Sequence, residues 1–240
     1  MQPGANRVMF PMADAAPGVL YDVTAEAMPA GAGQSLSVTR QLEFTPAYKV
    51  TPEQADALKA PERLDSVELG AGDFNELRGG TYGGADDASA RVTFGWTSDD
   101  LVVWIAQRDD VHAPVNATNP WGFDGPQLAI DPRHERSPSA TYLEVNFGLS
   151  PDGPIAFVQD QPHYTADLAA ERDEAAGMTY YRLKVPTAQL QIAAQPGTPL
   201  GLALILNDND GDGREGWLGY GRGIGAEKNP ALYREILLAR

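Results

Sequence analysis

Short apolar runs with a two-residue period dominate the chain from about residue 66 onward. The segment ARVTFGW (90–96) alternates Val92, Phe94 and Trp96 on one face, which is typical of a strand with one buried side. The segment LVVWIAQ (101–107) is almost continuously apolar, as expected of a strand covered on both faces. Further runs follow between turn-rich stretches such as SPDG and QPGTP; they are PQLAID, TYLEVNFG, IAFVQD, YYRLKVP, LGLALIL and YREILL. The pattern predicts an all-β fold, an antiparallel two-sheet β-sandwich of the jelly-roll type.

The same alternation predicts which side chains fill the core. Trp96 and Trp104 lie in the periodic runs, and we expect both to be buried. The other expected core residues are Val92, Phe94, Val103, Ile105, Leu128, Ile130, Leu202 and Leu204.

The N-terminal part of the chain predicts three further pieces. Residues 1–16 have the character of a tail, and residues 18–44 contain two strand-like runs around a Pro/Gly/Ala turn at 29–33, which indicates a hairpin. The segment TPEQADALKAPE predicts a short helix, because Thr51 can cap it, Pro52 suits its first position and Gln54 completes a capping box. We expect residues 17–65, the hairpin and helix, to pack on a main domain of residues 66–240, since the hairpin alone, with about 30 residues, cannot bury an independent core.

Composition excludes several classes of partner. The formal charge of −15 disfavours nucleic acid, whose phosphates must be met by clustered Lys and Arg. No apolar run is long enough to insert into a membrane, and the opening residues lack the apolar region of a signal peptide. The absence of cysteine excludes disulfides and thiolate metal sites. We expect a module of a larger multidomain protein, bacterial and either extracellular or periplasmic.

The segment NDNDGDGREGWLGYGRGI (207–224) places three carboxylates at alternate positions. Asp208, Asp210 and Asp212 with Gly213 resemble the start of a calcium loop, although Gly219 stands where an EF-hand would have its glutamate. Either a structural calcium ion neutralises these carboxylates, or the segment is a hairpin turn and Arg214 supplies part of the compensating charge.

Other acidic and histidine residues leave two interpretations open. Asp109 and Asp110 follow a strand and either join Asp124 or Asp131 around a calcium ion or cap a loop, and the loop is favoured. The three histidines, which are His112, His134 and His163, show no His-x-x-x-His or His-Glu-x-x-His spacing, so the sequence does not support zinc catalysis.

Three stretches taken together resemble the family 9 carbohydrate-binding modules and their relatives. They are SDDLVVWIAQRDDVH (98–112), NPWGFDGPQLAIDP (119–132) and LGLALILNDNDGDGREGWLGYGRGIGAEKNPALYREILL (200–238). The resemblance implies a β-sandwich with bound calcium that presents a slot to oligo- or polysaccharide, as a non-catalytic accessory to a polysaccharide-degrading or cell-surface protein.

The resemblance also implies site residues. Trp121 matches the slot tryptophan, whose ring stacks on a sugar, and Gln127 stands where sugar binders of the family carry a glutamate. Asn146 matches an asparagine position that contacts sugar. The family's second slot tryptophan is replaced by Glu227, and Tyr220 or Trp217 is expected to close the slot instead.

Three other functions compete with sugar binding. The sandwich is a structural or docking module if the missing second tryptophan has removed the sugar site. A haem-binding cytochrome-type sandwich would need an axial methionine, and no methionine lies in a segment resembling those domains. A glycosidase or lyase is not supported, because abundant carboxylates alone do not identify a catalytic pair.

Overall fold

The structure of the chain is a computed structural model that describes residues 20–27, 36–77, 79–116, 118–158 and 164–240. The predicted tail at 1–16 and the predicted turn at 29–33 lie outside these residues. No helix in the described ranges is long and apolar enough to span a membrane.

The strands are β1 (Leu20–Ala27), β2 (Leu36–Lys49), β3 (Val67–Leu69), β4 (Phe74–Glu76), β5 (Ser89–Trp96), β6 (Asp100–Arg108), β7 (Pro126–Asp131), β8 (Leu143–Ser150), β9 (Gly153–Val158), β10 (Asp167–Asp173), β11 (Met178–Pro186), β12 (Pro199–Asp208), β13 (Gly216–Tyr220) and β14 (Arg234–Leu238). The helical elements are α1 (Pro52–Asp56), α2 (Thr187–Leu190) and the 3-10 turns η1 (Ala71–Asp73), η2 (Pro120–Gly122) and η3 (Pro230–Leu232).

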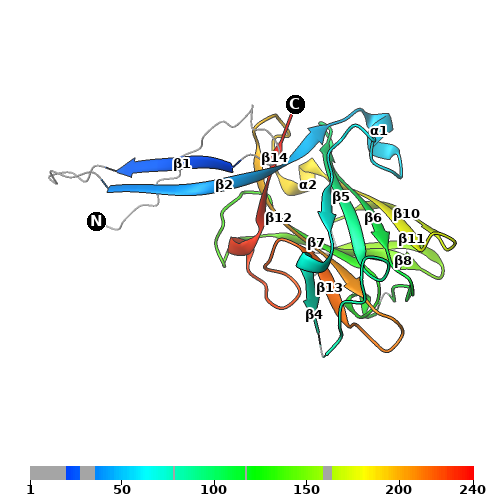
Figure 1. The fold of residues 1–240 in the computed structure, drawn as a ribbon. Coiled ribbons are helices and arrows are strands. Elements are labelled where there is room, and N and C mark those ends of the chain that lie inside the picture. The colour runs from blue at the N-terminus through cyan, green and yellow to red at the C-terminus, as the bar shows by residue number, and fades with distance from the viewer. Residues whose placement is uncertain (1–19, 28–35, 78, 117, 159–163) are drawn as a thin grey trace.

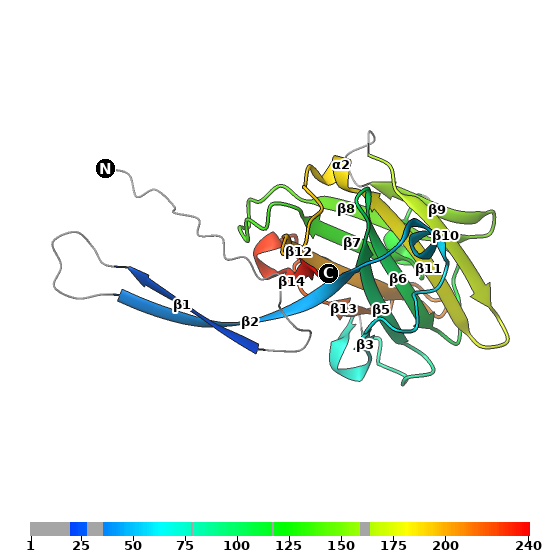
Figure 2. The ribbon, with the colours of Figure 1, turned by 90° about the horizontal axis from the view of Figure 1, so that it is seen from above.

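The described residues are mostly in strands and few are helical, which confirms the predicted all-β fold class. Hydrogen bonds join ten strands in one path, in the order β10-β11-β6-β5-β2-β14-β12-β7-β8-β9. The remaining strands pair at its side, β13 with β12 and β4, β3 with β5, and β1 with β2. The sheet bends over on itself, so that its two halves face each other as the layers of a sandwich (Figures 1 and 2).

The prediction of a purely antiparallel sandwich is wrong at one strand. β2 lies between β14 and β5 and runs parallel to both. Parallel neighbours need long connections, and the chain provides them, because α1, β3 and β4 separate β2 from β5 and most of the sequence separates β2 from β14. The strand joins the two halves of the sheet, so the hydrogen bonds form one continuous path. The part of β2 that enters the sheet precedes residue 66, the predicted start of the main domain.

The core lies between the two halves of the sheet. All ten predicted core residues are buried, Trp104 in a separate cluster under the segment that follows α1 and the others in the main core. Rings from the two halves meet there: Phe94 of β5 lies 5.3 Å from Tyr220 of β13, and Phe147 of β8 lies 5.9 Å from Tyr181 of β11, both between centroids. The period-two alternation therefore predicted the buried face correctly.

Local sequence explains the first helix but not the second. The Thr51 hydroxyl accepts from the Gln54 N–H at 3.3 Å, and the Gln54 side chain accepts from the Thr51 N–H at 3.0 Å, which is the predicted capping box. The helix ends at Asp56, earlier than the predicted segment. α2 was not predicted, because a four-residue helix has no 3.6-residue pattern; the Thr187 hydroxyl anchors its start on the Ser98 carbonyl at 3.0 Å.

β1 and the first half of β2 form an antiparallel arm. The pairing runs from Leu20 opposite Glu43 to Ala27 opposite Leu36. Figures 1 and 2 show this arm extending away from the two layers, while the second half of β2 continues into the sheet. The sequence predicted a hairpin packed on the main domain; among the described strands β1 pairs with β2 alone. The division of the chain at residues 16 and 65 stays a prediction.

Candidate functional site

Trp121 lies in η2, on the connection between β6 and β7. Its side chain is 46% exposed, whereas Pro120 beside it is buried. The turn is tight, since a Cβ at Gly122 would collide with the side chain of Asn119. A large ring held half-exposed by a tight turn offers an apolar contact surface to a ligand.

Three buried amide side chains, here called the amide row, lie close to this connection. Gln127 of β7 stands opposite Asn146 of β8, and the two residues are 4% and 1% exposed. Gln127 Nε2 donates to Asn207 Oδ1 of β12 at 3.4 Å, and Asn207 Nδ2 donates to the Gly125 carbonyl at 2.5 Å. Because Leu128, next to Gln127, enters the core, the amide row lies on the outer face of its sheet half.

The structure separates the two aromatic residues that were expected to close the slot. Tyr220 is fully buried in the core and donates to the Thr45 hydroxyl at 2.7 Å, so it cannot reach a sugar, and its prediction is wrong. Trp217 pairs in register with Asn207 and therefore shares the face of the amide row. Trp217 is only 9% exposed, and Gly225 packs against its ring.

Arg214 also lies near the amide row, which the sequence did not predict. Its guanidinium carbon lies 4.4 Å from the centroid of the Trp217 ring. Burial lowers the pKa of Arg214 to about 10, and its Nε and Nη2 atoms have no hydrogen-bond partner. The sequence interpretation offered this arginine as a counter-charge for the acidic loop, whereas the structure stacks its guanidinium on Trp217 with Nε and Nη2 buried.

Glu144, a second charged residue of this region, lies two residues before Asn146 on β8. Both carboxylate oxygens of Glu144 accept from Lys228 Nζ at 2.6 Å, and Glu144 is 4% exposed. Glu227, next to that lysine, is partly exposed and forms an ion pair with Arg222 at 3.5 Å. The loop that carries Glu227 thus reaches the strand of the amide row through Lys228.

Carboxylates gather beside the predicted calcium loop, but in a different set from the predicted one. Oxygens of Asp87, Asp110 and Asp210 lie within 4.8 Å of one another. Burial, with Asp87 and Asp210 nearby, raises the pKa of Asp208 to about 7, and burial with Asp87 raises the pKa of Asp210 to about 6. Asp212 is exposed and is in no such group among the described residues. The chemistry of the group is that of a cation site with oxygen ligands.

Asn209 ties this acidic loop to the turn that carries Trp121. Its Oδ1 atom accepts from the N–H groups of Gly211 at 2.7 Å and Gly213 at 3.1 Å, and its Nδ2 atom donates to the Gly122 carbonyl at 2.6 Å. One side chain therefore links the two loops by hydrogen bonds.

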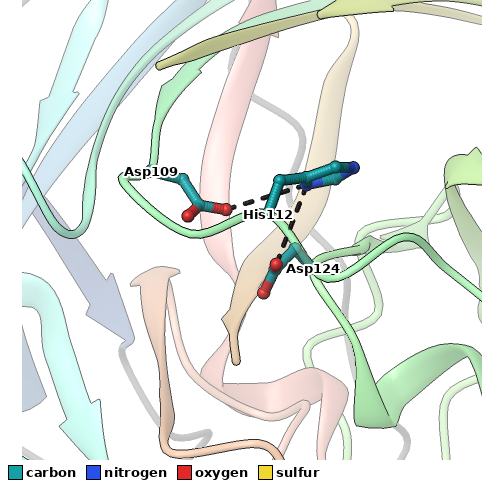
Figure 3. A group of neighbouring side chains, drawn as sticks. All are labelled: Asp109, His112 and Asp124. Carbon is teal, nitrogen blue, oxygen red and sulfur yellow. Dashed lines mark ion pairs between the residues drawn. The ribbon is translucent and has the colours of Figure 1, made fainter. Parts of the chain in front are cut away.

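The remaining acidic residues divide into two roles. Asp131 accepts from the N–H groups of Arg133 and Arg136, both at 3.1 Å, so it caps a loop. Asp109 and Asp124 instead approach each other on either side of His112 (Figure 3).

Comparisons with known proteins agree with this architecture. Residues 71–240 match the family described as carbohydrate family 9 binding domain-like. A family 9 carbohydrate-binding module from Caldicellulosiruptor kristjanssonii in complex with cellotriose shares the fold with a TM-score of 0.62 and 16% identity, over 82% of this chain and 94% of that chain. The same organism's module in complex with glucose gives a TM-score of 0.61 and 17% identity, over 82% and 97% of the chains. No curated protein matches this chain.

The bent β-sheet and the match of residues 71–240 to this family identify the chain as a carbohydrate-binding module. The family match covers well over half of the chain. This chain belongs to the carbohydrate family 9 binding domain-like family.

Proposed function

We propose that this module binds soluble oligosaccharides or chain ends at Trp121 and the amide row, without catalysing a reaction. The single observation that carries the proposal is a half-exposed tryptophan on the connection that the amide row holds through the Gly125 carbonyl. The exposed part of this ring suits a pyranose, whose axial C–H groups stack on an aromatic face. The structural neighbours crystallised with cellotriose and glucose support β-glucans as the first ligands to test.

The geometry predicts weak binding. One exposed ring replaces the sandwich of two rings that the family resemblance implies, because Glu227 holds the second position and Tyr220 is buried. A single stacking ring with a few hydrogen bonds must still overcome the entropy of association. We expect a Kd of about 10 μM to 1 mM, equivalent to about −7 to −4 kcal/mol.

Polar side chains near the amide row extend the proposed site. Arg214 is a partly exposed cation near this face, and Gln127 places an amide, bonded to Asn207, where the family resemblance implies a carboxylate. Trp217 contributes by supporting Arg214, since its own ring is covered. Asn146 lies in the amide row, and Glu227 lies at its margin beside Lys228.

Replacing Trp121 tests the proposal. Trp121→Ala should abolish binding to cello-oligosaccharides in calorimetry and leave Tm within about 2 °C, because a half-exposed ring contributes little to packing. Trp121→Phe is the matched control, which keeps a ring and should retain part of the affinity. If a glycan array and calorimetry find no ligand for the wild type, the chain is a docking sandwich that has lost its sugar site.

We also propose a structural calcium ion at Asp87, Asp110 and Asp210, with Asp208 alongside. The three clustered carboxylates fit the oxygen preference of calcium, and burial, followed by the neighbouring carboxylates, raises the pKa of Asp208 and of Asp210. The ion would neutralise this charge and hold the loop that Asn209 joins to the Trp121 turn. Chelator should lower Tm, and calcium should restore it by mass action; an unchanged Tm would favour the plain turn.

The cellular context is also a proposal. An acidic, cysteine-free module that binds polysaccharide suits an accessory role in a larger bacterial protein outside the cytoplasm. Fractionation of the native host with an antibody against this chain would test the location.

A further inference from the structure

Asp109, His112 and Asp124 converge on one point of the 109–124 connection (Figure 3). Asp109 directly follows β6, Asp124 lies two residues before β7, and His112 lies on the segment between them. His112 Nδ1 is 3.8 Å from Asp109 Oδ2 and 3.7 Å from Asp124 Oδ2. These separations are too long for hydrogen bonds. They are close to the roughly 3.4 Å that separates two ligand atoms bound about 2.1 Å from a tetrahedral metal ion.

The ligand atoms of this cluster are buried and lack partners. Asp109 and Asp124 are 2% and 0% exposed, and the His112 side chain is 7% exposed. Asp109 Oδ2, Asp124 Oδ1 and both ring nitrogens of His112 have no hydrogen-bond partner. Buried polar atoms are almost always paired in folded proteins, so the unpaired Nδ1 atom of His112, facing the two carboxylates, indicates a missing ligand at this point (Figure 3).

Charge points to a cation. Among the described residues, His112 is the only ion-pair partner of Asp109 and of Asp124. Arg172 Nη2 donates to the backbone carbonyl of Asp109 at 3.1 Å, but no Lys or Arg among the described residues forms an ion pair with either carboxylate, so one divalent ion would compensate their charge.

The backbone holds the two carboxylates in place. Asp109 Oδ1 accepts from the Val111 N–H at 3.0 Å, and Asp124 Oδ2 accepts from the Ala113 N–H. The chain on both sides of His112 is therefore bound to the two other members of the cluster. Such support orients ligands before an ion arrives.

We propose that Asp109, His112 and Asp124 bind a divalent transition-metal ion of the zinc type. Calcium takes oxygen ligands, whereas an imidazole with two carboxylates suits zinc, cobalt or nickel. This site shares no residue with the proposed calcium ligands. The bound ion closes the 109–124 connection, which carries Trp121 at its outer end, and so fixes the turn that presents the ring.

Metal binding to chelator-treated wild-type protein tests the site, with excess calcium present to occupy oxygen-only positions. We expect one equivalent of Co²⁺ to give visible absorption bands and Zn²⁺ to remove them. His112→Gln should weaken Zn²⁺ binding at least about tenfold. His134→Gln, the matched control at a histidine outside the cluster, should leave the affinity unchanged.

A measurement on the wild type covers the case in which the His112 variant does not fold. In protein labelled with ¹⁵N-histidine, Zn²⁺ should shift the ring nitrogens of His112 and leave those of His134 and His163 in place. Three results would overturn the proposal: no Co²⁺ bound when calcium is present, equal Zn²⁺ affinity in His112→Gln, or a ring-nitrogen shift confined to the other histidines. The last two would identify adventitious binding elsewhere.

Discussion

Replacing Asp208 with asparagine should stabilise the metal-free protein at pH 7.5. Asp208 is 4% exposed, and burial together with Asp87 and Asp210 raises its pKa from 3.8 to about 7. The folded chain therefore binds the carboxyl proton of Asp208 more tightly than the unfolded chain does. Ionisation opposes folding above pH 4, and the penalty grows until the pH passes 7.

The size of the effect follows from these two pKa values. Between pH 7.5 and pH 5.5 the wild type should gain at most about 2 kcal/mol from Asp208, and about 1–2 kcal/mol is expected because solvent at the exposed loop screens part of the repulsion. For a chain of this length that is roughly 2–8 °C in Tm. Asp208→Asn mimics the protonated group and should lack this part of the pH dependence.

Urea unfolding of both proteins in chelator, at pH 5.5 and 7.5, measures the difference directly. The variant should be the more stable protein at pH 7.5, and its advantage should shrink at pH 5.5. With calcium added, the order should reverse, because the ion stabilises the fully charged site. A wild-type protein that is the more stable at pH 7.5 in chelator would refute the account of Asp208.

The core and the arm give two further predictions. Phe147→Ala should lower the free energy of unfolding by about 3–5 kcal/mol, because it opens a cavity against Tyr181, and Phe147→Leu should cost less; urea unfolding checks both. Removing residues 1–35 takes away β1, whose only strand partner among the described residues is β2, and this truncation should leave Tm within about 2 °C. Removing residues 1–49 also deletes β2, the strand between β14 and β5, and this truncation should prevent cooperative unfolding. Equal melting curves for the two truncations would contradict the role given to β2.

Alternation along single strands was enough to predict the core, because the buried face of a strand is a local property. Successive side chains of a strand point to opposite faces, so Val92 and Phe94 face the main core while Thr93 between them faces away from it. The place of β2 between β14 and β5 was not predictable in this way, since strand pairing depends on contacts between distant segments. A parallel pairing leaves no sign in either strand alone.

Spacing along the sequence predicts some features of the candidate site and misses others. Trp217 and Tyr220 are three residues apart on one strand, so they must lie on opposite faces, and this spacing alone shows that only one can face the amide row. Asp109, His112 and Asp124 have no regular spacing, because an irregular connection brings them together. Their grouping depends on the path of that loop, which the surrounding strands determine.

β2 has a mechanical consequence. The strand runs from the projecting arm directly into the middle of the hydrogen-bonded path, between two parallel neighbours (Figure 2). Tension applied to the arm would act along β2 and load its hydrogen bonds to β5 and β14 together, in shear, rather than one after another as in peeling an edge strand. The module would therefore resist being pulled from its N-terminal side at the point where its two layers are joined.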